Sequence, residues 1–90
     1  MNATLQDTDI SIHIGKPYNV ILFNDADHDM QEVADQIIKA IHCDLGTAHK
    51  IMLEAHESGR AIVFTGHLEK CELVASILEE IRLGTKIEPV

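Results

Sequence analysis

The sequence YNVILFNDADHDM, residues 18–30, predicts a strand, a turn and the beginning of a helix. Its first six residues are mostly aromatic or branched apolar and follow Pro17, which is typical of a largely buried strand. Asn24 to Asp27 form turns readily and place carboxylates at the exit of that strand. Asp29 and Glu32 have the spacing of a capping box, so a helix should begin immediately after Asp29.

Capping signals divide the following segment into two helices. The first should end near His42, and its apolar residues recur at helical spacing: Met30, Val33, Ile37 and Ile41. Asp44 can cap a second helix, and Gly59 can end it in a left-handed conformation. The apolar stripe of the second helix consists of Ala48, Ile51, Met52 and Ala55. A very short turn therefore joins the two helices.

The rest of the chain predicts two more strands around a third helix. Residues 60–65, RAIVFT, are strand-like, Leu68 to Leu83 has a helical period, and Thr85 to Glu88 can close the sheet. The residues of the third helix that should face the core are Cys71, Val74, Ala75, Leu78 and Ile81. The order β-α-α-β-α-β predicts an α+β, small two-layer domain, with a three-stranded antiparallel sheet packed on three helices.

The length of 90 residues suits one domain, which we place at residues 18–90. Residues 1–17 form a separate N-terminal arm in this interpretation. Within the arm, Ile10 to Ile14 alternate as in a strand, but Gly15, Lys16 and Pro17 separate them from the strand predicted at Tyr18.

The charge balance limits the classes of partner. Fifteen acidic and seven basic residues give a formal net charge of -8, which disfavours nucleic acid and anionic membranes. Neither a secretory signal nor a transmembrane segment is visible, so we expect a cytoplasmic protein. Cys43 and Cys71 lack CxxC spacing and are interpreted as reduced, structural thiols.

Two groups of polar residues are candidate binding residues. Asn24 and Asp25 follow a strand, where functional side chains often lie, although both residue types also serve simply to form turns. His56 follows Met52 by four residues and can lie beside it at the edge of the apolar stripe. The alternative is a surface histidine near a helix C-terminus, favoured there by the helix dipole.

Metal binding and catalysis are less well supported. His42, His49 and His56 recur every seven residues, about 10 Å along a helix, so they cannot all reach one ion at about 2 Å. His28 and His67 have no partner at ligand spacing and are interpreted as solvated. Asp25 and His56 could pair in a small hydrolase, but no nucleophile motif accompanies them. We therefore expect no metal, no cofactor and no enzyme activity.

The combination of two segments resembles the ClpS family. One is PYNVILFND, residues 17–25, followed by Met30, and the other is IMLEAHESGRA, residues 51–61. They are similar to the family's YxVxLxND strand and loop, its helix opening near a methionine, and its MLxxHxxGxA segment. The resemblance covers nearly all of residues 18–90.

The resemblance implies an adaptor without catalysis. Such a protein binds N-degrons, meaning substrates whose first residue is Leu, Phe, Tyr or Trp, for the N-terminal domain of a ClpA- or ClpC-type unfoldase. It would act as a monomer. By position, the residues matching those that hold the substrate's α-amino group are Asn24, Asp25 and His56. Those matching the side-chain pocket are Met30, Val33, Met52, Ala55 and Leu83.

The chain departs from the family pattern at three positions. Ala26 stands where a second acidic residue is common, and Ala55 stands where a larger aliphatic residue is common, so the pocket should be wider. Val74 occupies a place where relatives often carry a basic residue used in docking to the unfoldase. The alternative function is an acidic protein-interaction domain on the same fold, without an N-degron pocket.

Overall fold

Three strands and three helices follow one another along residues 15–90, the part of the chain that the computed structural model describes. They are β1 (Tyr18–Phe23), α2 (Met30–Ile41), α3 (Leu45–Ser58), β2 (Arg60–Gly66), α4 (Leu68–Glu79) and β3 (Thr85–Pro89). This order confirms the predicted α+β fold. The predicted arm, residues 1–17, lies largely outside the described residues, and the boundary at residue 18 stays a prediction.

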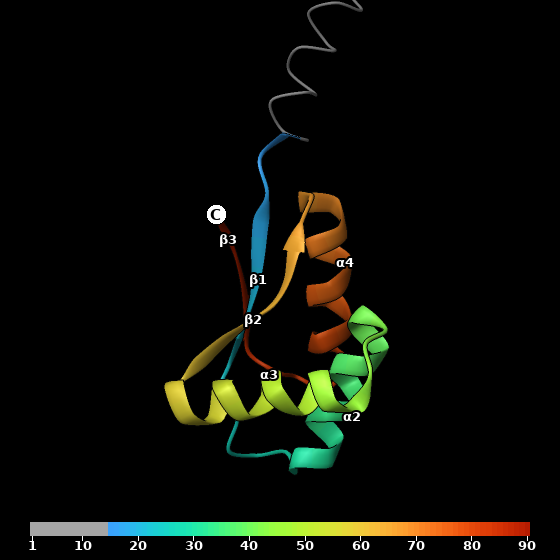
Figure 1. The fold of residues 1–90 in the computed structure, drawn as a ribbon, viewed down its shortest axis with the longest axis vertical. Coiled ribbons are helices and arrows are strands. Elements are labelled where there is room, and N and C mark those ends of the chain that lie inside the picture. Colours follow the sequence, from blue (N-terminus) through green and yellow to red (C-terminus); the bar gives the residue numbers. More distant parts are fainter. Residues whose placement is uncertain (1–14) are drawn as a thin grey trace, which may run out of the picture.

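The first strand lies in the middle of the sheet. The strand order is β2-β1-β3, and both neighbours run antiparallel to β1. Leu22 of β1 lies opposite Ala61 on one side and Thr85 on the other. In Figure 1, α4 runs alongside the sheet and α3 crosses near the end of β1. The exit of β1, where the candidate polar residues begin, is therefore flanked by both other strands.

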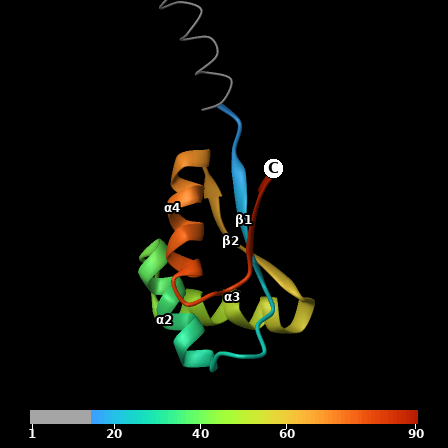
Figure 2. The ribbon, with the colours of Figure 1, turned by 180° about the vertical axis from the view of Figure 1, so that it is seen from behind.

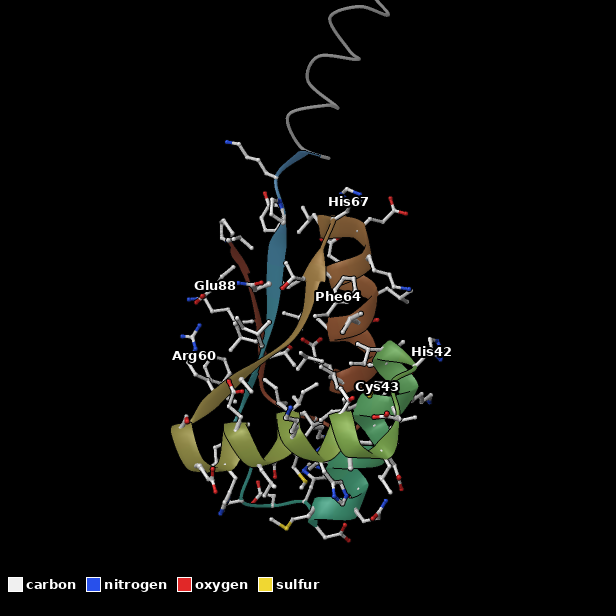
Figure 3. The ribbon with its side chains drawn as sticks, in the orientation of Figure 1. His42, Cys43, Arg60, Phe64, His67 and Glu88 are labelled. Atoms are coloured by element: carbon white, nitrogen blue, oxygen red, sulfur yellow. The ribbon has the colours of Figure 1, made fainter. Side chains whose placement is uncertain are left out.

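The two faces of the sheet have different surroundings. Val20 and Leu22 are no more than 1 % exposed and belong to the core formed with the three helices. The opposite face has a polar covering: Arg60 donates to Glu88 at 2.9 Å, and its guanidinium lies 5.8 Å from the centre of the Phe23 ring. Figure 3 shows Arg60 and Glu88 on the side of the sheet away from α4.

The ends of α2 and α3 are fixed by the side chains that the sequence indicated. Asp29 Oδ1 accepts a hydrogen bond from the Glu32 N–H at 2.8 Å, and Asp44 Oδ1 accepts one from the Thr47 N–H at 2.7 Å. Gly59 ends α3 with φ of 89°, a conformation that costs a glycine little. These caps confirm the predicted helix boundaries to within a residue.

The third helix is shorter than predicted. It ends at Glu79, and the chain then turns away in a Schellman motif whose left-handed residue is Arg82. The Leu83 N–H donates to the Leu78 carbonyl and the Arg82 N–H donates to the Glu79 carbonyl, with Arg82 at φ 65°. The helical pattern therefore continues for several residues in the sequence after the backbone has turned toward β3.

Both cysteines are free, and the surroundings of each disfavour reactivity. Cys71 is fully buried in the core and its Sγ lies 3.4 Å from the Tyr18 carbonyl, while Cys43 is half-buried. Burial raises the pKa of both thiols above the ordinary value, which lowers the thiolate fraction at neutral pH. This agrees with their interpretation as structural thiols.

Candidate functional site

A pocket lies where β1 ends, between the β1–α2 loop, the start of α2 and α3. Its volume is about 340 Å³, including the part that is open to solvent. The lining residues are Leu22, Phe23, Asn24, Asp25, His28, Met30, Val33, Met52, Ala55 and His56. Figure 2 shows the β1–α2 connection running past α3 to reach α2. Because this volume includes open solvent, the enclosed part of the pocket is much smaller, and most of a ligand held there would stay in contact with water.

The backbone at the start of the β1–α2 loop is held from both edges of the central strand. The Phe23 N–H donates to the Gly84 carbonyl at 3.0 Å, and the Asn24 N–H donates to the Gly59 carbonyl at 3.0 Å. Gly84 and Gly59 immediately precede the two flanking strands. The loop that carries the polar residues therefore starts from a fixed position.

Asp25 forms the turn, as its residue type suggested, but the turn does not use all of its carboxylate. Oδ1 accepts the backbone N–H groups of Asp27 and His28, each at 2.7 Å. Oδ2 bonds to the His28 ring at Nδ1, 2.9 Å away. A carboxylate has about four lone-pair positions, so one acceptor position remains, on Oδ2. Asp25 is thus both a turn former and a potential acceptor in the pocket.

His28 was interpreted as solvated, and this was wrong. Its side chain is only 18 % exposed, against 13 % for Asp25, and the ring lines the pocket. The contact between Asp25 and His28 depends on the conformation of the loop. The backbone reverses direction in the turn after Asp25, and this brings the His28 ring next to the Asp25 carboxylate. The available signal was the Asp-x-x-His spacing itself, which allows a carboxylate that caps a turn to meet an imidazole three residues later.

The pair shifts the pKa values of both partners toward their charged forms. Burial acts to raise the pKa of the Asp25 carboxyl, but the hydrogen bonds from His28 and Asp27 outweigh it, and the pKa is lowered. The hydrogen bond to Asp25 raises the pKa of His28 above the ordinary value, against a smaller effect of burial. Asp25 is therefore ionised at neutral pH, and the net charge of the Asp25–His28 pair depends on whether His28 is protonated.

The other wall of the pocket comes from α3. Met52 and Ala55 are buried, at 7 % and 3 % exposed, and His56 follows them at the exposed end of the stripe. Val33 of α2 is 6 % exposed, whereas Met30, at the first position of α2, is 50 % exposed. The lining of the pocket therefore combines buried apolar side chains, one exposed methionine and several polar groups.

The structure brings together seven of the eight residues carried over from the resemblance. The exception is Leu83, which is 2 % exposed in the core and is not among the lining residues. It lies after the Schellman turn rather than on a continued α4. Leu22, Phe23 and His28 line the pocket instead, although no sequence pattern assigned them to it.

The polar side chains that line the pocket are one amide, one carboxylate and two imidazoles, from Asn24, Asp25, His28 and His56. The described residues that line it include no serine, threonine, cysteine or lysine that could act as a nucleophile. Across residues 15–90, no group of three or more His, Cys, Asp or Glu side chains is placed to hold a metal ion. Nor does any helix in that range combine the length and apolar character needed to cross a membrane.

Fold and pocket together define a small α+β domain that presents a pocket lined by apolar and polar side chains. A family model described as "ATP-dependent Clp protease adaptor protein ClpS" matches residues 14–85. The ATP-dependent Clp protease adapter protein ClpS of Gloeobacter violaceus is 37 % identical over 73 residues, which is 80 % of this chain and 78 % of that protein. The chain therefore belongs to the ClpS family of Clp protease adaptors, as the resemblance implied.

A solved structure has the same fold. It is described as "The structure of Agrobacterium tumefaciens ClpS2 bound to L-phenylalaninamide". Its TM-score is 0.79 at 23 % sequence identity, and the match covers 83 % of this chain and 98 % of the ClpS2 chain. The arrangement of β1, α2 and α3 around the pocket is thus part of a fold that is found in another protein of the family.

Proposed function

We propose that this adaptor binds the free N-terminus of proteins whose first residue is Leu, Phe, Tyr or Trp. The observation that carries the proposal is a pocket whose lining includes both apolar side chains and the polar residues Asn24, Asp25 and His56. An N-terminal residue has a matching pattern, with an α-ammonium group and a side chain on one carbon. L-Phenylalaninamide, the ligand of the ClpS2 neighbour, has a free α-amino group beside a benzyl side chain, which supports the same assignment here.

The acceptors suit an α-ammonium group. With a reference pKa of about 7.7 to 8.0, this group is mostly cationic at neutral pH and needs acceptors. Asp25 offers the remaining position on Oδ2, and the Asn24 carbonyl and a neutral His56 nitrogen would provide two more. Met30, Val33, Met52 and Ala55 would surround the side chain. No role in the pocket is proposed for Leu83, because it is not among the residues that line the pocket.

The expected affinity is moderate. Each charge-assisted hydrogen bond contributes roughly 1.5 to 3 kcal/mol, and burial of a Leu or Phe side chain contributes about the same. Three bonds and one side chain give about 6 to 12 kcal/mol before association costs, which are at least about 4 kcal/mol. The dissociation constant should therefore be near micromolar or weaker. Such a value suits a carrier that must release its substrate.

Delivery is the second part of the proposal. The adaptor would pass bound substrates to the N-terminal domain of a ClpA- or ClpC-type unfoldase, acting in the cytoplasm as a monomer and without enzyme activity of its own. Val74 is fully buried in α4, so this position contributes to the core and offers no side chain for docking. Titration of the purified unfoldase domain with the adaptor tests this step separately from substrate capture.

Calorimetric titration with peptides that differ only at their first residue tests capture. Peptides beginning with Leu, Phe, Tyr or Trp should bind, and the same peptides acetylated at the N-terminus should not, because acetylation removes the charge. Equal affinity for both forms would contradict the proposal. If binding also fell steeply with added salt, the result would favour the acidic protein-interaction domain.

A further inference from the structure

We infer that His28 is a positioning residue of the amino-group site, and that its protonation weakens capture of an N-terminus. The inference rests on the proposed function of the pocket and adds a regulatory property to it. It is based on the bonding of Asp25, on the partial burial of the histidine beside it, and on the charge that the pair presents to a ligand.

The geometry makes Asp25 dependent on His28. Residue 28 supplies two of the three groups that bond to the carboxylate: its N–H to Oδ1 at 2.7 Å and its ring Nδ1 to Oδ2 at 2.9 Å. The ring bond fixes the rotation of the carboxylate, and Oδ2 is the oxygen with an acceptor position left for a ligand. The ring therefore determines the direction in which that position points.

The charge of the ring determines how strongly Asp25 attracts a cation. With neutral His28, protonated at Nδ1, the carboxylate is oriented and its negative charge is unopposed. With cationic His28, the pair is neutral overall, and an arriving α-ammonium group would share Oδ2 with another cation. The hydrogen bond from the α-ammonium group to Oδ2 can then keep its geometry, but the cationic ring removes much of the electrostatic attraction that strengthens it.

The groups that surround His28 favour its cationic form at pH values where histidine is usually neutral. Asp25 in the same loop raises the pKa of His28 most, and Glu32 on α2 and the Ile81 carbonyl in the turn after α4 act in the same direction. His56 faces the same pocket from α3. The pKa of His28 is therefore raised above its ordinary value, chiefly by the hydrogen bond to Asp25.

The sign of the effect follows from linkage. A ligand that prefers neutral His28 must lower the pKa of His28 when it binds, and affinity must rise as the pH increases through the titration of that ring. His56 is common to the wild-type protein and to variants at residue 28, so a difference between their pH profiles reports on residue 28 alone.

His28→Asn separates orientation from titration. The asparagine amide nitrogen is as many bonds from the backbone as the histidine Nδ1, so it can donate to Oδ2 without changing charge. His28→Ala removes both properties. His67→Asn is the matched control, because His67 precedes α4 at the end of the domain away from α3 and its side chain makes no capping bond (Figure 3).

The experiment measures the dissociation constant of a peptide beginning with Phe between pH 5.5 and 7.5. The partial titration of the peptide's own amino group near the upper limit is the same for every variant and cancels in the comparison. From pH 7.5 to 5.5, the affinity of the wild type should fall at least about fivefold more than the affinity of His28→Asn. This difference is below the theoretical maximum, since the uptake of one proton can change affinity by at most about tenfold per pH unit. His28→Ala should bind about tenfold more weakly at pH 7.5, the effect of one bond to a charged group. His67→Asn should follow the wild type.

NMR titration of the His28 ring with and without peptide provides a second readout. The pKa of His28 should fall when the peptide binds. Identical pH profiles for wild type and His28→Asn, together with an unchanged His28 pKa, would overturn the inference while leaving N-terminal binding intact. Absence of wild-type binding to any free N-terminus across the pH range would instead overturn the proposed function, and the inference with it.

Discussion

Replacement of Asp25 by asparagine tests the amino-group site most directly. The amide oxygen can still accept the N–H groups of Asp27 and His28, which lie 2.7 Å from Oδ1. The amide nitrogen would take the place of Oδ2, 2.9 Å from the His28 ring, and neutral His28 can accept from it after a change of tautomer. The turn should therefore persist, while the negative charge and the last free acceptor position are both lost.

The magnitude follows from the bond that is removed. A hydrogen bond between charged groups contributes roughly 1.5 to 3 kcal/mol, which corresponds to a loss of about ten- to hundredfold in affinity. Fluorescence anisotropy with a peptide that begins with Phe and is labelled at its C-terminus measures this loss at pH 7.5. Thermal unfolding of the same preparation should show little change, since the turn bonds are kept.

Asp27→Asn is the control for the general effect of charge. Asp27 lies two residues away in the same loop, is exposed and does not line the pocket, so the substitution changes the net charge equally without touching the site. It should alter affinity much less than Asp25→Asn does, because the exposed Asp27 side chain acts on a ligand only through water and makes no bond to it. Equal losses in both variants, or an Asp25→Asn affinity within twofold of wild type, would refute the reasoning.

Three further substitutions examine the rest of the pocket and the core. His56→Ala should weaken peptide binding more than tenfold at pH 7.5 in calorimetry, with an unchanged melting temperature; unchanged affinity would remove His56 from the site. Ala55→Val adds bulk to a buried wall, so binding of peptides beginning with Trp or Phe should fall severalfold relative to Leu, whereas a uniform loss would indicate general damage. Leu78→Ala should cost about 2 to 5 kcal/mol in urea unfolding, because Leu78 is fully buried, and a cost below about 1 kcal/mol would contradict its place in the core.

Local signals explain why most of the fold was predictable. Asp29, Asp44 and Gly59 each mark a helix end through bonds or dihedral angles that involve only a few neighbouring residues. The strand order β2-β1-β3 was not predictable, because it depends on pairing between residues far apart in the sequence, such as Leu22 with Ala61 and Thr85. The end of α4 was missed because Arg82 occupies the left-handed position that glycine usually takes.

The candidate site was predictable to the extent that its residues occupy motif positions. Asn24, Asp25, Met52 and His56 follow recognisable spacing, and the structure places them in one pocket. Leu83 was assigned by position alone and is not among the lining residues, so its place in the side-chain pocket stays a prediction. His28 was missed since its contact with Asp25 arises from the conformation of a loop, which periodicity does not describe.

The central position of β1 has a consequence for the speed of capture. The residues immediately before β2 and β3 bond to Asn24 and Phe23, so the backbone leading into the loop is ordered when the domain folds rather than when a ligand arrives. Association then needs no slow rearrangement, and its rate constant should be about 10⁵ to 10⁷ M⁻¹s⁻¹. At micromolar affinity, a bound protein would stay for roughly 0.1 to 10 s. For delivery to succeed, an unfoldase would have to bind the substrate protein within that time.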